Sequence, residues 1–126
     1  MSLIFDAGAF VALERNDRAM WRRLKAAQLA RTLPRTHGGV IAQVWRGGSR
    51  RQAPLGRALK AVETTPLDED LGRRAGILLA RSSSDDAIDA AVVAIASHDD
   101  RIITSDPSDI IGLIQAAGLR SDVVVA

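Results

Sequence analysis

The chain has 126 residues, no cysteine, 47% hydrophobic residues and a formal net charge of +2. This length fits a single domain over residues 1–126, and the lack of cysteine excludes a disulfide framework and any cysteine-ligated metal. No apolar run approaches the roughly 18 residues that cross a membrane, and residues 1–10 (MSLIFDAGAF) lack the basic start of a signal peptide, so we expect a cytoplasmic protein without a membrane partner.

The first half of the chain begins with residues 2–5 (SLIF), an apolar run typical of a buried strand. The pattern then predicts a short helix over 7–17 and a second over 18–33, with Asp17 as its N-cap and Pro34 as its stop. Residues 35–39 (RTHGG) are too polar to predict a strand. Residues 40–48 (VIAQVWRGG) predict a helix closed by two glycines, and a basic loop leads to a further helix around 55–62.

The second half opens with a weak strand at 62–67 (VETTPL), and Asp68 starts a helix over 69–82. Ser84 is the expected cap of a helix from Asp85 to about Ser97, followed by a strand at 101–104, a helix at 107–118 and a final strand at 122–126. Short apolar strands that alternate with helices predict an α/β domain with a mainly parallel sheet.

Two of the predicted strands end in an acid. Asp6 directly follows the first strand, and Asp106 follows the strand at 101–104 after Ser105. In open α/β sheets ligands bind at the carboxyl ends of the strands, so both carboxylates lie at the expected functional edge. Each is also explained as a helix N-cap, where Asp is favoured, and Pro107 at the first helical position strengthens this alternative for Asp106.

The predicted helix at 85–97 holds carboxylates in apolar surroundings. Asp85 and Asp86 fall at its start, where the helix dipole favours acids, but Asp89 lies a turn further in, within AIDAAVVAIA. Spacings of three and four residues place these acids on one face, where like charges repel. A partly desolvated carboxylate needs a cation or a proton, and hard oxygen ligands favour Mg²⁺ or Mn²⁺. The sequence therefore predicts an acidic metal site.

Four segments together resemble the PIN-domain ribonucleases, and within them the VapC-type toxins of toxin–antitoxin modules. They are LIFDAGAFVAL (3–13), GVIAQVWRGG (39–48), DAAVVAIA (89–96) and RIITSDPSD (101–109). No segment is specific alone, but their order and spacing cover almost the whole chain. The resemblance implies a three-layer α/β/α sandwich with a mainly parallel central sheet, acids that bind Mg²⁺ or Mn²⁺, and metal-dependent cleavage of RNA.

The resemblance also implies which acids form the site. Asp6 matches the family's first-strand acid, Asp89 the acid of the central helix, and Asp106 the acid of the T-x-D turn after the next strand. Asp86, one turn before Asp89, can share the helix role. Asp109 is expected to be a capping or surface acid.

Gln43 is the one departure from the family pattern. The family usually has Glu at this position, and no other acid lies between Asp17 and Glu63. A Gln side chain can offer its carbonyl oxygen or position a water, but it adds no charge. Weaker metal binding or a slower reaction is therefore expected, and a non-catalytic member of the family is an alternative.

The two halves of the chain carry opposite charge: residues 1–62 hold 12 Lys or Arg and 3 acids, and residues 63–126 hold 5 and 12. Two solvated faces that neutralise each other explain this as well as a basic surface beside an acidic site. Arg46, Arg50 and Arg51 follow Gln43 in an acid-free stretch and are predicted to contact RNA phosphates. The alternative for these arginines is a solvated helix and loop.

The histidines and tryptophans are not assigned to a site. His37 and His98 are isolated and are expected at the surface or as caps. Trp21 and Trp45 fit apolar helix faces and are expected in the core or an interface.

By the same resemblance, a small cognate antitoxin inhibits the protein, which forms a homodimer. Two other classes stay open. A PIN-fold binding module whose Gln43 has ended catalysis should show no carboxylate-dependent Mn²⁺ uptake in a calorimetric titration. A phospho-acceptor domain also ends its first strand with Asp, but the sequence has no lysine near its last strands, and binding of a phosphate analogue tests it.

Overall fold

The computed structural model describes residues 1–126 and contains a five-stranded sheet in the order β3-β2-β1-β4-β5, with every neighbouring pair parallel. The strands are β1 (Leu3–Phe5), β2 (Arg35–His37), β3 (Glu63–Thr65), β4 (Arg101–Thr104) and β5 (Asp122–Val125). The helices are α1 (Ala7–Glu14), α2 (Arg18–Leu29), α3 (Gly38–Val44), α4 (Ala53–Leu59), α5 (Glu69–Arg81), α6 (Ala87–Ile95) and α7 (Pro107–Ala117), with a 3₁₀ turn η1 (Arg50–Gln52).

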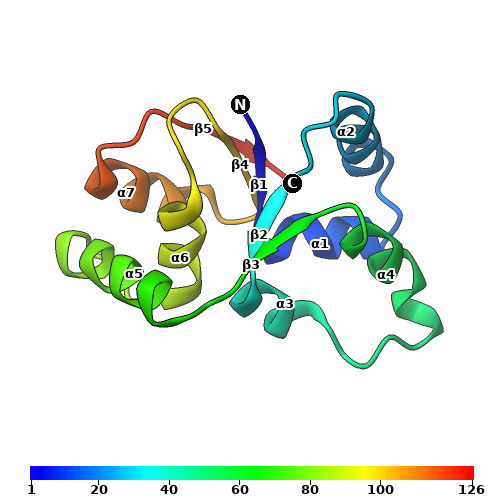
Figure 1. Ribbon diagram of the computed structural model, residues 1–126, viewed down its shortest axis with the longest axis horizontal. Coiled ribbons are helices and arrows are strands. Elements are labelled where there is room, and N and C mark those ends of the chain that lie inside the picture. Colours follow the sequence, from blue (N-terminus) through cyan, green and yellow to red (C-terminus); the bar gives the residue numbers. More distant parts are fainter.

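The elements form three layers. Figure 1 shows the sheet in the middle, with α1, α2 and α4 on one side and α5, α6 and α7 on the other. The predicted α/β/α sandwich with a parallel central sheet is therefore confirmed. None of the helices combines the length and the apolar character that crossing a lipid bilayer requires.

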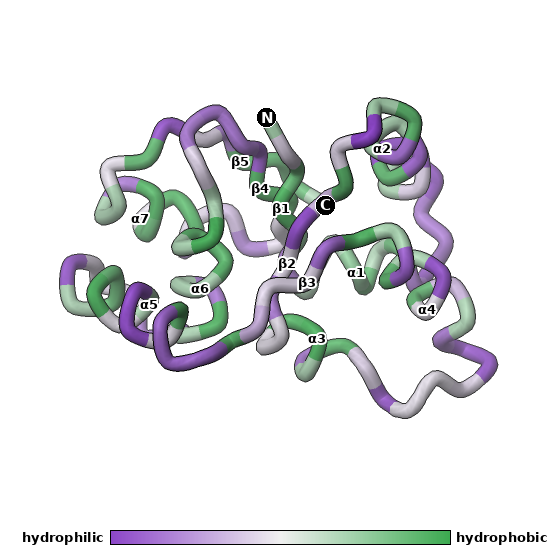
Figure 2. Tube along the Cα trace, in the orientation of Figure 1, coloured by the Kyte–Doolittle hydropathy of each residue, from purple (hydrophilic) through white to green (hydrophobic).

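The core fills the space between the sheet and both helix layers. Ile4 and Phe5 of β1 are fully buried, and the Phe5 ring meets the Phe10 ring edge to face, with centroids 5.6 Å apart. Strands β1 and β4 and helix α6 are apolar over most of their length, whereas α5 alternates hydrophilic and hydrophobic residues (Figure 2). Burying both faces of a parallel sheet explains why β1 and β4 have no polar alternation.

Strand β2 is the element that the sequence did not predict. Its Thr36 and His37 are polar and fully buried. The Thr36 hydroxyl donates to the Phe5 carbonyl at 2.8 Å, and both ring nitrogens of His37 have partners. Because every buried side-chain nitrogen and oxygen atom has a hydrogen-bond partner, the segment tolerates burial without apolar side chains.

Several helix boundaries differ from the sequence-based prediction. Helix α1 ends at Glu14, and α3 covers Gly38–Val44, so Gly47 and Gly48 lie beyond the end of α3 and do not close it as expected. Helix α2 ends at Leu29, earlier than expected, because Arg31 adopts a left-handed backbone with a φ of 57°. Helix α6 begins at Ala87, and its N-cap is Asp86 instead of Ser84, so Asp85 precedes the helix. The Asp86 carboxylate offers a stronger, charged acceptor to the first-turn N–H groups than a serine hydroxyl does.

The connection between α3 and η1 is ordered by one buried side chain, Gln52. Its Oε1 accepts from the backbone N–H groups of Arg46 at 2.8 Å and Gly48 at 3.2 Å. Its Nε2 donates to the Val44 carbonyl at 2.8 Å and to the Glu14 carboxylate at 2.9 Å. One amide therefore fixes the turn to α1 with four hydrogen bonds.

We expect the substitution Gln52→Leu to lower the free energy of unfolding by roughly 2–4 kcal/mol, because the backbone groups of Val44, Arg46 and Gly48 lose a hydrogen-bond partner. Urea denaturation followed by circular dichroism measures the change. The matched control is Gln115→Leu on α7, where the side chain is exposed and the expected change is within about 0.5 kcal/mol. Equal losses for both variants contradict this assignment.

Candidate metal centre

The carboxyl ends of β1 and β4 meet in the middle of the sheet. Phe5 pairs with Ile103, and the Asp6 N–H donates to the Ile103 carbonyl at 3.2 Å. From β1 the chain proceeds to β2 and β3 on one side, and β4 and β5 lie on the other, so the crevice between β1 and β4 is the topological switch point where doubly wound sheets bind ligands. Asp6 and Asp106 follow these two strands.

Asp6 is buried directly after β1 and is the N-cap of α1. Only 6% of its surface is exposed, and its Oδ1 accepts from the Ala9 N–H at 3.3 Å. Burial raises the pKa of the carboxyl, and hydrogen-bond donors around it, Thr104 first among them, partly offset that rise. The cap therefore uses one oxygen and holds the carboxylate in a fixed orientation.

Asp106 occupies the N-cap position of α7, but its carboxylate does not cap the helix backbone. Its Oδ1 instead accepts from the Ser108 hydroxyl at 3.3 Å, and its own N–H donates to Thr104 Oγ1 at 2.9 Å. Capping does not explain this acid, because its oxygens leave the helix N–H groups free. The buried Thr104 hydroxyl fixes the turn on which the exposed carboxylate stands.

Asp86 and Asp89 have different environments on α6. Oδ1 of Asp86 accepts from the N–H groups of Ile88 and Asp89, both at 3.0 Å, so Asp86 is the helix cap. Asp89 is half-buried one turn further in. Burial, followed by the charges of four neighbouring carboxylates, raises the pKa of Asp89 to about 7. Those neighbours are, in order of effect, Asp86, Asp6, Asp109 and Asp106.

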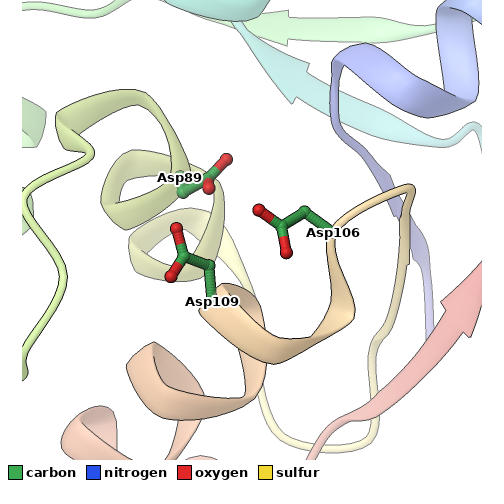
Figure 3. A group of neighbouring side chains, drawn as sticks. All are labelled: Asp89, Asp106 and Asp109. Atoms are coloured by element: carbon green, nitrogen blue, oxygen red, sulfur yellow. The ribbon is translucent and has the colours of Figure 1, made fainter.

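Three carboxylates converge at this point. Asp89, Asp106 and Asp109 each offer an oxygen within 4.8 Å of the others, and Figure 3 shows the side chains directed toward a common space. Asp109 was expected to be a capping or surface acid, and the structure instead groups it with two predicted ligands. The signal was present in the sequence, because residues three apart at a helix start share a face.

The donor set fits a divalent cation. Carboxylate oxygens are the ligands that Mg²⁺ and Mn²⁺ prefer, and none of the chain's ion pairs neutralises these acids. Asp89 feels the charge of four other carboxylates with no basic partner, and a cation would relieve that repulsion. The structure brings Asp89 and Asp106 into the group of three, whereas Asp6 and Asp86 act on Asp89 through their charge without belonging to it.

His37 links the helix that carries Asp89 to β2. His37 was expected at the surface or as a cap. It is fully buried, and its capping role is confirmed because its Nδ1 accepts from the Gly39 N–H at 3.0 Å. The proton therefore lies on Nε2, which donates to the Ile88 carbonyl at 3.0 Å. Burial lowers the pKa of His37, which favours this neutral form. The ring fixes the first turn of α6 beside Asp89.

Gln43 lies on the last turn of α3, where its exposed side chain has no hydrogen-bond partner in the protein. It lines a surface hollow together with Arg46 and Arg51. Arg50 is exposed but is not part of this lining, so the structure brings together two of the three arginines predicted to contact RNA. Arg15 of the segment after α1 lines the same hollow and was missed.

The remaining residues without an assigned role are structural. Trp21 packs partly against the core, and its Nε1 donates to the Leu13 carbonyl at 3.1 Å. Trp45 is 40% exposed, so it does not lie in the core, and its place in an interface stays a prediction. His98 is exposed, and its Nδ1 accepts from the Arg120 N–H.

Comparison with known proteins gives a fold. No family model matches the sequence, and no curated protein matches it closely enough to report. The chain is similar in structure to a chain of the crystal structure of VapBC2 from Rickettsia felis bound to a DNA fragment from their promoter. The TM-score is 0.70 at 13% sequence identity, with 98% of both chains covered. This likeness, together with the parallel sheet and its two helix layers, shows that the chain has a PIN-like fold.

Proposed function

We propose that the protein is a metal-dependent endoribonuclease of the VapC type and the toxin of a toxin–antitoxin pair. The observation that carries this proposal is the convergence of Asp89, Asp106 and Asp109 at the switch point of a PIN-like sheet, with the pKa of Asp89 raised to about 7 by burial and by its acidic neighbours. Acids that stand so close without a basic partner are stabilised when a cation binds.

Each acid has a distinct part in the proposed site. Asp89 and Asp106 are the central ligands of Mg²⁺ or Mn²⁺, and Asp109 faces the same space. Asp6 adds a further negative charge from the end of β1, and the Ala9 N–H fixes the orientation of its carboxylate. Asp86 uses one oxygen as the helix cap, which leaves the other for the ion or a water.

A bound divalent ion supplies an activated water and neutralises charge on the scissile phosphate. The protein holds the groups around that phosphate rigidly: Thr104 fixes the turn of Asp106, and His37 fixes the turn of Asp89. When the water oxygen bonds to phosphorus, the bond to the 3′ oxygen breaks and that oxygen takes up a proton. The expected products therefore carry a 5′-phosphate and a 3′-hydroxyl.

The same likeness supports an antitoxin as a partner of this chain. The similar structure is named VapBC2 and includes a DNA fragment. We propose that a small cognate antitoxin binds and inhibits this chain, that the chain forms a homodimer, and that it acts in the cytoplasm.

A second candidate is a PIN-fold binding module without catalysis. Gln43 favours it, because the family's usual Glu is missing at this position and the amide has no partner in the protein. A calorimetric titration with Mn²⁺ separates the candidates: heat of binding that Asp89→Asn removes supports a metal centre, and no such heat supports the binding module.

The test of the proposed activity is cleavage of single-stranded RNA in Mn²⁺ by the native chain, Asp6→Ala and Gln43→Glu. We expect slow cleavage by the native chain, a loss of at least about 100-fold in Asp6→Ala, and faster cleavage by Gln43→Glu, because an added carboxylate strengthens metal binding. Asp122→Ala is the matched control, since Asp122 is exposed at the start of β5. If neither the native chain nor Gln43→Glu cleaves RNA, the nuclease proposal is wrong. Cleavage by Gln43→Glu alone identifies the binding module.

A further inference from the structure

A surface hollow of about 740 Å³ lies between α1, α3 and the segment that leads into η1. Arg15, Arg46 and Arg51 line it, together with Gln43, Glu14 and Gln52. Only two of its nine lining residues are hydrophobic. The hollow is thus a polar and basic surface, in contrast to the acidic group at the ends of β1 and β4.

The positive charge in this hollow is not neutralised within the protein. None of the chain's ion pairs includes the three arginines. Glu14 is the one acid in the lining, and its Oε1 is held by the Gln52 amide. Three guanidinium groups beside one carboxylate leave an excess of positive charge that suits an anionic ligand.

The wall of the hollow is preorganised. Gln52 fixes the turn through four hydrogen bonds, and the Trp45 ring lies against Gly48, where a Cβ would come within 2.7 Å of it. Gly48 also has a φ of +74°, which disfavours any side chain. Nη1 of Arg46 donates to the carbonyls of Ala42 and Trp45. Arg46 is therefore held in place, while Arg15 and Arg51 make no hydrogen bond through their side chains.

The hollow also lies within reach of the candidate metal centre. Helix α1 starts directly after Asp6 and ends at Glu14, and Arg15 is its C-cap. At 1.5 Å per helical residue, Arg15 is about 13 Å along the helix from Asp6. A strand bound at the acidic group can therefore reach the arginines with the next few nucleotides.

We propose that this hollow binds backbone phosphates of a single RNA strand next to the cleaved bond, with Arg15 and Arg51 as the contacting residues. The identification of the strand as RNA rests on the proposed nuclease function. A planar guanidinium matches phosphate geometry, and the amide of Gln43 adds a neutral donor. A protein segment would need apolar anchors, of which the lining offers few. Such contacts give affinity without base specificity.

The test is fluorescence anisotropy with a short labelled single-stranded RNA in EDTA, so that binding is measured apart from cleavage. The variants are Arg15→Gln, Arg51→Gln and the double variant, and the matched control is Arg120→Gln, an exposed arginine outside the hollow. We expect each single variant to bind roughly 3- to 10-fold more weakly and to reduce the slope of log affinity against log salt by about 0.7. The control should change affinity less than about twofold.

The outcomes separate this proposal from the proposed activity. Arginine-dependent RNA binding supports the hollow as a phosphate site even if no variant cleaves RNA. If the native chain cleaves RNA but the arginine variants bind like Arg120→Gln, the hollow proposal is wrong and the nuclease proposal stands. The proposal is also wrong if the native chain binds no RNA, or if the same variants lose binding of a glutamate-rich peptide while their RNA affinity is unchanged.

Discussion

The substitution Asp89→Asn is expected to abolish Mn²⁺-dependent RNA cleavage and, at the same time, to stabilise the metal-free protein. Asp89 stands among four other carboxylates, and burial and their charges raise its pKa to about 7. An amide of the same shape removes a central ligand, so we expect cleavage to fall by at least about 100-fold. The same amide also removes a desolvated charge that the folded state holds at a cost.

The gain in stability depends on pH. The Asp89 carboxyl has a pKa of about 7 in the folded chain and a reference value of 3.8. Between these two pH values the folded chain binds a proton at Asp89 that the unfolded chain has lost. The contribution of this group to the free energy of unfolding therefore falls as pH rises, and it stops falling above a pH of about 7. The full difference corresponds to about 4 kcal/mol, and we expect about half of it or less because Asp89 is partly open to water.

Urea denaturation at several pH values tests this prediction in EDTA. Asp89→Asn should be about 1–2 kcal/mol more stable than the native chain at about pH 8, and nearly equal to it at about pH 4. In a separate series without EDTA, added Mn²⁺ should stabilise the native chain and leave the variant unchanged. The matched control is Asp85→Asn, which removes an exposed carboxylate that does not perturb Asp89. A variant that is less stable than the native chain at high pH contradicts the interpretation.

The substitution Gly8→Ala is expected to damage the site from within the fold. A Cβ at Gly8 would lie 2.5 Å from the Ser105 Cβ and 2.8 Å from the Ser105 backbone nitrogen. Backbone cannot give way as a flexible side chain does, so α1 and the turn after β4 must separate. Those two segments carry Asp6 and Asp106. We expect a loss of about 1–3 kcal/mol in the free energy of unfolding and a fall in cleavage of roughly 10- to 100-fold.

Gly76→Ala is the matched control for this change. Gly76 is exposed inside α5, and a Cβ there meets nothing within 4 Å. Alanine in place of glycine in a helix interior should therefore raise stability by about 0.5–1 kcal/mol and leave cleavage unchanged. Thermal melts and initial cleavage rates give both values. If Gly8→Ala is as stable and as active as Gly76→Ala, close packing of these segments does not position the site.

The periodicity of the sequence was sufficient for most of the fold. Apolar runs without alternation predicted β1 and β4, and Asp17 and Asp68 predicted the caps of α2 and α5, which their carboxylates form with Met20 and Leu71. Strand β2 was missed because its burial depends on hydrogen bonds to other segments. A pattern of apolar residues cannot report such long-range partners.

The acids between positions 85 and 109 show the same limit. By sequence they differ little, yet Asp100 is buried as a structural residue that pairs with Arg35 at 2.9 Å and accepts from the N–H groups of Ser2 and Ser97. Asp86 is a helix cap, whereas Asp106 keeps its carboxylate free of the helix backbone. Local sequence gives each of these aspartates the same tendency to cap a turn or helix. The groups that its carboxylate contacts in the folded chain determine whether it caps, pairs with an arginine or remains free of the backbone.

The sequence by itself determined the alternation of strands and helices, the parallel sheet and the position of Asp6 and Asp106 just after two of its strands, because these depend on local periodicity and on where strands end. Only the tertiary structure decided that Asp109 joins Asp89 and Asp106, and that Arg15 and Arg51 line the same hollow. Both groupings unite residues from different elements. Their distances are set by the packing of helices on the sheet, which no short stretch of sequence encodes.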